Sequence, residues 1–98
     1  MPYAYQQDVP ITEDVYRKII EKLGPEPLAG LLTHVVVKRE DGTLRYIDVW
    51  ESQAACDKAF EERIHPAVYG VFKEIRFMPK GEPRRDLMQV VDVTFGGR

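Results

Sequence analysis

Residues 32–52 predict a β-hairpin that leads directly into a helix, and this stretch restricts the fold more than any other part of the chain. Two apolar runs, 32–38 and 44–50, flank the turn sequence Glu40-Asp41-Gly42. Apolar, β-branched runs joined through Asp-Gly are typical of neighbouring antiparallel strands. Ser52 follows as a good N-cap for a helix. The remainder of the chain must therefore complete a sheet around these two strands.

The flanking segments predict two further strands and at least two helices. Residues 3–9 and 86–95 have strand patterns, and 96–98 are expected to be a frayed end. Helical spacing covers 13–23, after an N-cap at Thr12, and 53–64. His65-Pro66 breaks or kinks the second helix, and Pro66 could equally open another helix over 67–75. The order β-α-β-β-α-β predicts an α+β, ferredoxin-like fold with a four-stranded antiparallel sheet, in which residues 1–98 form one domain.

Composition excludes several classes of protein. Lys and Arg number 14 against 16 Asp and Glu, and a net charge of −2 argues against nucleic acid as a partner. The short basic pair Arg84-Arg85 is expected to be solvated. The single cysteine, Cys56, allows no intrachain disulfide and is expected to be a small buried side chain. No signal-peptide pattern and no apolar run of about 20 residues is present, so we expect a cytoplasmic protein with no membrane partner.

The predicted sheet carries more apolar surface than helices on one face can cover. One side of the hairpin is aliphatic, with Val35, Val37, Ile47 and Val49. The other side is also largely apolar, with Leu32, Val36, Tyr46 and Trp50. Leaving a few hundred Å² of such surface in water would forgo several kcal/mol, at about 25 cal/mol per Å². We therefore expect the open face to meet a second copy, sheet to sheet, in a homodimer.

The string Ile47-Asp48-Val49-Trp50-Glu51-Ser52, followed by Ala55, Phe60 and Pro66, resembles the strand–helix junction of the dimeric α+β barrel superfamily, which includes the antibiotic-biosynthesis-monooxygenase-like domains. The resemblance implies a ferredoxin-like subunit, a barrel formed by the two sheets of a dimer, and a ligand pocket between each sheet and its own helices. Members include cofactor-free monooxygenases, haem-degrading enzymes, isomerases and proteins with no known activity.

The chain departs from the better-known active sites of that superfamily. It contains no asparagine, so the Asn used by some quinone-forming monooxygenases and haem degraders has no counterpart. His65 lies further beyond Trp50 than the haem-ligand spacing of haem degraders suggests. The two histidines and the scattered acids show no recurring ligand spacing that would indicate a metal site. We therefore expect no cofactor.

The length of the hairpin turn decides which side chains meet. A three-residue loop with Gly42 in the left-handed conformation places Val36 opposite Tyr46, His34 opposite Asp48 and Leu32 opposite Trp50. A loop one residue longer or shorter would put His34 and Asp48 on opposite faces. The separation of aliphatic from aromatic and polar residues favours the three-residue loop.

With this register, His34 and Asp48 are direct neighbours between the aromatic residues Tyr46 and Trp50. A carboxylate beside an imidazole fixes its tautomer and raises its basicity. We hypothesise that His34 takes a proton from an activated carbon or hydroxyl of a hydrophobic, aromatic or polyketide-like molecule, and that Asp48 orients the ring. Tyr46, Trp50 and Phe72 would hold the substrate. The alternative is a buried polar pair that satisfies itself and does no chemistry.

Three other residues have two interpretations each. His65 is expected to be a C-terminal cap that benefits from the helix dipole, with a role in the pocket as the alternative. Tyr5 is more typical of packing, although it could reach the pocket from the neighbouring strand. Trp50 suits a core anchor as well as a ligand wall.

Three functions are compatible with these features, and it is uncertain whether the protein is an enzyme. The first is a cofactor-independent monooxygenase or isomerase that acts on a hydrophobic small molecule. The second is a non-catalytic binding or regulatory module, and the third is a structural dimer with a filled core. An RNA-binding domain is disfavoured, because the aromatic and glycine-rich strand signature is missing. A cavity beside His34 would separate the first function from the third.

Overall fold

The computed structural model describes residues 2–96, and its elements follow the predicted order β-α-β-β-α-β. The strands are β1 (Tyr3–Val9), β2 (Leu31–Lys38), β3 (Leu44–Trp50) and β4 (Arg85–Met88). The helical segments are α1 (Glu13–Leu23), α2 (Gln53–Ala59), the π-helical η1 (Phe60–Ile64) and α3 (His65–Ile75). The α+β, ferredoxin-like prediction is therefore confirmed.

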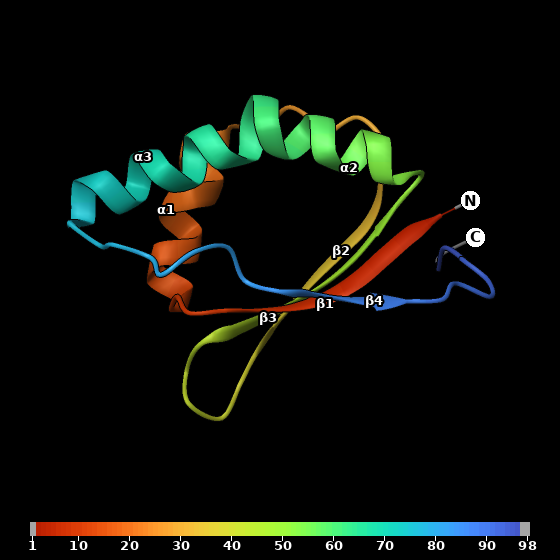
Figure 1. Ribbon diagram of the computed structural model, residues 1–98, viewed down its shortest axis with the longest axis horizontal. Helices are drawn as coiled ribbons and strands as arrows, with labels where there is room; N and C mark the ends of the chain where they lie inside the picture. Colours follow the sequence, from red (N-terminus) through yellow and green to blue (C-terminus); the bar gives the residue numbers. More distant parts are fainter. Residues whose placement is uncertain (1, 97–98) are drawn as a thin grey trace.

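The four strands form one antiparallel sheet in the order β2-β3-β1-β4. The helices all lie over the same face of this sheet, with α2, η1 and α3 following one another in a long rod and α1 beside α3 (Figure 1). Two clusters of buried side chains fill the space between the layers. One is built around Val71 and Phe72, and the other around Tyr5, Trp50 and Cys56. Burial of Cys56 is as predicted.

The β2–β3 turn is the predicted three-residue loop. Gly42 has a φ of 87°, and its N–H donates to the carbonyl of Arg39 at 2.9 Å. The N–H of Arg39 donates across the hairpin to Thr43 at 2.7 Å. This left-handed position favours glycine because a Cβ there would be strained. The turn sets His34 opposite Asp48 and Val36 opposite Tyr46, so both of these predicted pairs are confirmed.

At the far end of the hairpin the predicted register is wrong by one residue. Leu31, not Leu32, lies opposite Trp50, because a β-bulge falls between Leu31 and Thr33. The chain enters β2 through Gly30, whose φ is 84° and where a Cβ would lie only 2.6 Å from the side chain of Ala55. This close approach to α2 fixes the strand start, and the bulge absorbs the extra residue.

The predicted break at Pro66 does not end the helix. The chain stays helical from Gln53 to Ile75, and η1 supplies an extra residue just before the proline. Pro66 has no N–H to donate and its ring would clash with the carbonyl four residues back, which a wider π turn avoids. His65 accordingly donates its backbone N–H to the carbonyl of Phe60. The expected helix over 67–75 lies within α3, whereas the C-terminal cap role of His65 is wrong.

The last strand is shorter than predicted. The pattern over 86–95 indicated a long strand, but β4 ends at Met88. Met88 lies opposite Ala4, and β1 begins one residue earlier at Tyr3, so only Tyr3 remains beyond this pair. Residues 89–96 have no regular structure, and Val91 is 97% exposed. Residues 97 and 98 of the expected frayed end lie outside the described part of the chain.

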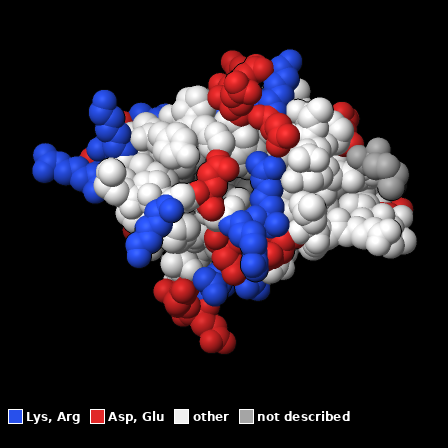
Figure 2. Space-filling model, viewed as in Figure 1, with Lys and Arg blue, Asp and Glu red and all other residues white. Residues whose placement is uncertain are grey.

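The two faces of the sheet differ as the hairpin pattern predicted. His34, Val36, Tyr46, Asp48 and Trp50 face the helices, whereas Val35 and Val37 on the opposite face are 44% and 40% exposed. Acidic and basic side chains are interspersed on the face shown in Figure 2. None of the helices in the described range has the length and apolar content that a membrane span requires.

Candidate functional site

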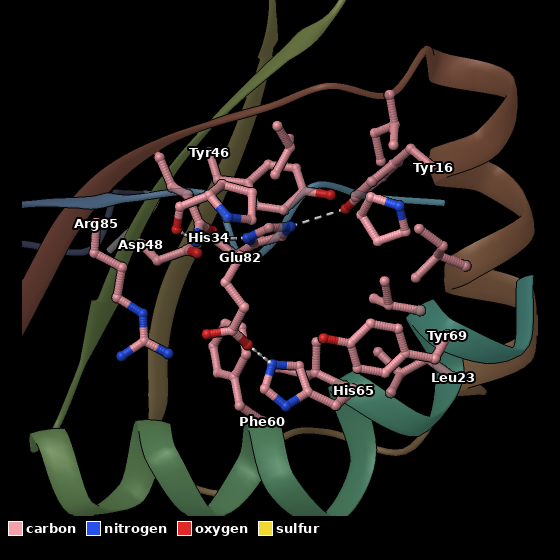
Figure 3. Close-up of a pocket in the computed structure, with 18 of the residues that line it drawn as sticks. Tyr16, Leu23, His34, Tyr46, Asp48, Phe60, His65, Tyr69, Glu82 and Arg85 are labelled. Atoms are coloured by element: carbon pink, nitrogen blue, oxygen red, sulfur yellow. Dashed lines mark hydrogen bonds and ion pairs between the residues drawn. The ribbon is translucent and has the colours of Figure 1, made fainter. Parts of the chain in front are cut away.

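A cavity of about 160 Å³ lies between the sheet and the helices, and its walls are mostly apolar. Side chains from every layer line it, including Leu31 and Trp50 from the sheet, Leu23 from α1, and Ile64 and Phe72 from η1 and α3. Both core clusters therefore contribute to its walls. The cavity predicted beside His34 is present, which a structural dimer with a filled core would lack (Figure 3).

His34 and Asp48 form the polar part of the sheet wall. They face each other across the β2–β3 ladder, and Nδ1 of His34 is hydrogen-bonded to Oδ1 of Asp48. Asp48 is only 3% exposed, whereas the His34 side chain keeps about a third of its surface open. Because a carboxylate only accepts hydrogen bonds, we assign the proton of His34 to Nδ1, which leaves Nε2 as the basic nitrogen.

Tyr16 completes this arrangement, and the sequence analysis missed it. Its hydroxyl lies 2.8 Å from Nε2 of His34, and its ring stacks beside the imidazole at 6.1 Å between centroids. The pKa of Tyr16 is raised, first by burial and then by the negative charge of Asp48. Tyr16 stands three residues before Ile19 and seven before Leu23, so helical spacing places it on the buried stripe of α1. This spacing is the sequence feature from which the position of Tyr16 could have been predicted.

Tyr46 and Trp50 both line the cavity from β3. The Tyr46 ring packs edge-on to His34 at 5.3 Å and to Tyr16 at 5.8 Å. Burial raises the pKa of Tyr46, and Tyr16 and Asp48 raise it further. The indole N–H of Trp50 donates to the hydroxyl of Tyr5 at 3.3 Å. Trp50 is thus a core anchor and a cavity wall at once.

Tyr5 is not brought to the cavity surface. It is fully buried and is not among the cavity-lining residues, because it packs against Trp50 and Cys56. Its pKa is raised, mainly by burial and next by the charge of Asp48. A role for Tyr5 in ligand binding therefore stays a prediction. Tyr5 could affect a ligand only indirectly, because it helps to hold Trp50 in position.

His65 and Phe72 line the opposite, helical wall. His65 Nε2 is paired with the carboxylate of Glu82, which lies on the loop between α3 and β4 (Figure 3). The rings of Phe60 and Tyr69 flank the imidazole at 5.4 and 5.5 Å. Glu82 lies between the predicted helix over 67–75 and the predicted last strand, and no pattern in that segment indicates that it folds back over the cavity.

Arg85 was expected in solvent and is instead turned toward the helices. Its guanidinium lies 4.6 Å from the ring centroid of Phe60 and 5.1 Å from that of Tyr5. It also reaches the hydroxyl of Tyr3 and the carboxylate of Asp57, both at 3.3 Å. Arg85 belongs to the helix-facing row of β4, opposite Gln7, and a sequence pattern cannot assign that register.

Among residues 2–96, no group of three or more His, Cys, Asp and Glu side chains is arranged to hold a metal ion. The two histidine–carboxylate pairs lie on different walls, with one histidine each. The arrangement can bind an apolar ring and can move a proton. What it offers chemically is acid–base catalysis in a mostly apolar cavity.

Comparisons with known proteins support the fold. No family model and no curated protein matches the sequence. Among solved structures, Rv0793 from Mycobacterium tuberculosis is similar, with a TM-score of 0.62, 13% identity and coverage of 97% of this chain and 100% of the other. A protein assigned as an antibiotic biosynthesis monooxygenase from Chloroflexus aurantiacus J-10-fl gives a TM-score of 0.65 at 16% identity, covering 99% of this chain and 100% of the other.

A further antibiotic biosynthesis monooxygenase is similar over 94% of this chain and 100% of its own, with a TM-score of 0.59 and 23% identity. At such identities the likeness concerns the path of the backbone and carries no residue roles. The chain therefore has, over nearly its whole length, the fold of the antibiotic biosynthesis monooxygenase-like proteins.

Proposed function

We propose that the protein binds a small aromatic molecule between its sheet and its helices and removes a proton from that molecule, with His34 as general base. The observation that carries this proposal is the His34–Asp48 pair in the wall of an apolar cavity. Asp48 holds Nδ1 and so leaves Nε2 as the basic nitrogen, which suits a base that works near neutral pH. Removal of a proton from an activated carbon or hydroxyl serves a cofactor-independent oxygenation as well as an isomerisation.

The size of the cavity favours a ligand with one ring. Its volume is about 160 Å³. An apolar cavity of about 150 Å³ in another protein holds benzene. A polyketide-like ligand with several rings would require the loop that carries Glu82 to move away. Tyr46 and Trp50 on one wall, with Phe72 and His65 on the other, would hold the ring.

Trp50 makes binding directly measurable, because it is the only tryptophan in the chain. We expect one-ring aromatics, such as toluene and acetophenone, to change its fluorescence. Acetophenone also tests the chemistry, because its methyl protons are acidic enough to exchange with heavy water when a base is positioned beside them. The protein should accelerate this exchange. His34→Gln should bind acetophenone with an affinity within about threefold of wild type and lose the acceleration.

Two results would contradict the proposal. If no aromatic compound changes the fluorescence of Trp50, the cavity does not bind such molecules. If His34→Gln accelerates the exchange of acetophenone as much as wild type does, His34 is not the base. A second candidate function, a ligand-binding module without chemistry, is favoured by the hydroxyl of Tyr16, which already occupies Nε2 of His34. Such a module would bind acetophenone and leave its exchange rate unchanged.

The open face of the sheet supports a homodimer as the working unit. Val35 and Val37 are exposed there, and Ile47 and Val49 on the same face are half-buried. An isologous contact requires only one self-complementary patch, and these four aliphatic side chains provide one. The cavity lies on the other side of the sheet, so each subunit would keep its own site. The cytoplasmic location expected from the sequence is part of the same proposal.

A further inference from the structure

We propose that Tyr16 is the third member of a proton relay, Asp48–His34–Tyr16, and that the ligand served by this relay carries an acidic hydroxyl, as a phenol or an enol does. This inference rests on the proposed function, since it concerns the same cavity. It adds a catalytic residue on α1 and narrows the class of ligand from aromatic molecules in general to those that can give up a hydroxyl proton.

The first step in the argument is that both nitrogens of His34 have partners. Nδ1 is bonded to the buried carboxylate of Asp48, and Nε2 lies 2.8 Å from the hydroxyl of Tyr16. With the proton on Nδ1, the hydroxyl of Tyr16 donates to Nε2. A ligand therefore cannot reach the basic nitrogen of His34 unless it displaces Tyr16. The group that the relay presents to a ligand is the oxygen of Tyr16, which keeps free lone pairs.

The second step is that Tyr16 stays a neutral phenol. Burial and the charge of Asp48 both raise its pKa, so at neutral pH it has a proton to give to His34. Its position is restrained by ring contacts to His34 at 6.1 Å and to Tyr46 at 5.8 Å. Tyr16 and His34 come from different layers, α1 and β2, so their hydrogen bond joins the two layers along one edge of the cavity (Figure 3).

The proton transfer balances without any further reactant. The hydroxyl proton of the ligand passes to the oxygen of Tyr16, while the proton of Tyr16 passes to Nε2 of His34. The products are the ligand anion and an imidazolium that Asp48 stabilises, and Tyr16 is again a neutral phenol that donates to the new anion. A phenolate or enolate formed in this way is the electron-rich species that either an oxygenation or a shift of a double bond would use. The reverse transfer restores the resting state.

Acidity selects the ligand class. Transient removal of a proton is enough for exchange, but an anion persists beside an imidazole base only if the ligand is itself acidic, so an aliphatic alcohol would keep its proton at equilibrium, whereas a phenol or an enol can release it. The cavity admits about one ring. The chemistry therefore points to one-ring phenols and cyclic enols.

The test begins with the protein alone. Imidazole nitrogen NMR shifts should show Nε2 of His34 accepting a hydrogen bond in wild type, and in Tyr16→Phe that signal should move toward the position of a free imidazole nitrogen. Tyr3→Phe is the matched control, because the hydroxyl of Tyr3 contacts Arg85 and not His34. Its Nε2 signal should match wild type. An Nε2 shift that is identical in wild type and Tyr16→Phe would overturn the relay.

The second part uses para-nitrophenol, whose anion absorbs visible light, and para-nitroanisole, which has the same shape and no acidic proton. Below the pKa of free para-nitrophenol, wild type should bind both compounds and generate phenolate from the first. In Tyr16→Phe, the ratio of bound phenolate to bound phenol should fall by about tenfold or more, because a hydrogen bond to the anion is lost. In His34→Gln, which also serves if Tyr16→Phe fails to fold, phenolate formation should disappear.

The outcomes separate the two proposals. If both compounds bind and no phenolate forms, or if Tyr16→Phe forms as much as wild type, the relay is overturned and the binding site stands. If neither compound binds to wild type, the proposed function fails and the relay fails with it. Binding of both, with phenolate that depends on Tyr16 and on His34, supports the relay.

Discussion

Asp48 lies directly opposite His34 in the β2–β3 ladder, and its buried carboxylate is bonded to Nδ1 of the imidazole. Register brings the two side chains together, because the three-residue turn at Gly42 sets the pairing along the hairpin as far as the bulge between Leu31 and Thr33. The pair is therefore a consequence of local hairpin chemistry, while its partner Tyr16 depends on how α1 crosses the sheet.

Replacement of Asp48 by asparagine should destabilise the protein and disturb His34. The variant keeps the shape of the side chain but converts a charge-assisted hydrogen bond into a neutral one. We expect the free energy of unfolding to fall by about 1–3 kcal/mol. Urea denaturation measures the loss, and imidazole nitrogen NMR should show that the proton is no longer confined to Nδ1. Asp86→Asn, an exposed carboxylate of β4, is the control and should change neither quantity.

The loop that carries Glu82 should control how fast ligands enter and leave. Glu82 pairs with His65, and the side chain of Gln7 donates to the carbonyl of Pro83 at 3.0 Å, so the loop is tied to both layers. In Glu82→Gln the contact to His65 loses its charged acceptor, and we expect ligand exchange to accelerate by up to about fivefold, since such a half-exposed pair contributes about 1 kcal/mol or less. Stopped-flow fluorescence of Trp50 measures the rates.

Glu62→Gln is the matched control for this prediction. Glu62 is exposed on η1 and does not line the cavity, so its replacement should leave the exchange rates unchanged. Equal rates in Glu82→Gln and wild type would mean that ligands enter elsewhere and that the loop does not restrict them.

Stability should fall in alkaline solution because of three tyrosines. The pKa values of Tyr5, Tyr16 and Tyr46 are raised, in each case first by burial. Their folded-state pKa values exceed the unfolded value of about 10, so the folded protein holds these protons more tightly. The associated stability is complete below about pH 10 and is lost as the pH rises above it. Ultraviolet absorbance should show phenolate from these residues only as the protein unfolds.

Tyr46→Phe gives the corresponding check. Removal of one such phenol should weaken the dependence of the unfolding free energy on pH in the alkaline range, because one fewer proton is released on unfolding. Tyrosine titration that completes while circular dichroism still reports a folded protein would show that these side chains are accessible to water and that their pKa values are not raised.

Local patterns predicted the parts of this molecule that depend on neighbouring residues in the chain. The hairpin, its turn and the His34–Asp48 pair follow from alternation and from Asp41-Gly42, and the cap at Ser52 is confirmed by its hydrogen bond to the backbone N–H of Ala55 at 3.1 Å. The bulge at Leu31 escaped prediction because it depends on the contact between Gly30 and α2.

The remaining parts depend on tertiary geometry. β4 is short because β1 supplies no partner beyond Tyr3, and Arg85 faces the helices because of its register against β1. Tyr16 and His34 are 18 positions apart and meet only because α1 packs over β2. Glu82 reaches His65 through a loop with no pattern of its own. Sequence patterns thus predicted cavity-lining residues on the sheet and, with His65 and Phe72, on α3, and missed the residues that α1 and the α3–β4 loop supply.

A charge on the open face of the sheet should weaken association of the subunits. Val37 is 40% exposed on this face, and a two-fold interface would bring two copies of any substitution into one contact. Val37→Lys should therefore raise the dissociation constant of the dimer by about tenfold or more, since desolvated like charges cost several kcal/mol. Sedimentation velocity over a range of concentrations measures the change.

The control for this prediction is Ala54→Lys, which adds the same charge at an exposed position of α2, on the helical side of the molecule. It should sediment as wild type does, because the helices lie on the face away from the proposed contact (Figure 1). We expect wild type to be mostly dimeric at micromolar concentration, through an interface of the usual size for specific contacts, about 1,200–2,000 Å² in total. If wild type instead sediments as a monomer at every concentration, the valines of β2 are a solvent-exposed surface and the proposed interface does not form.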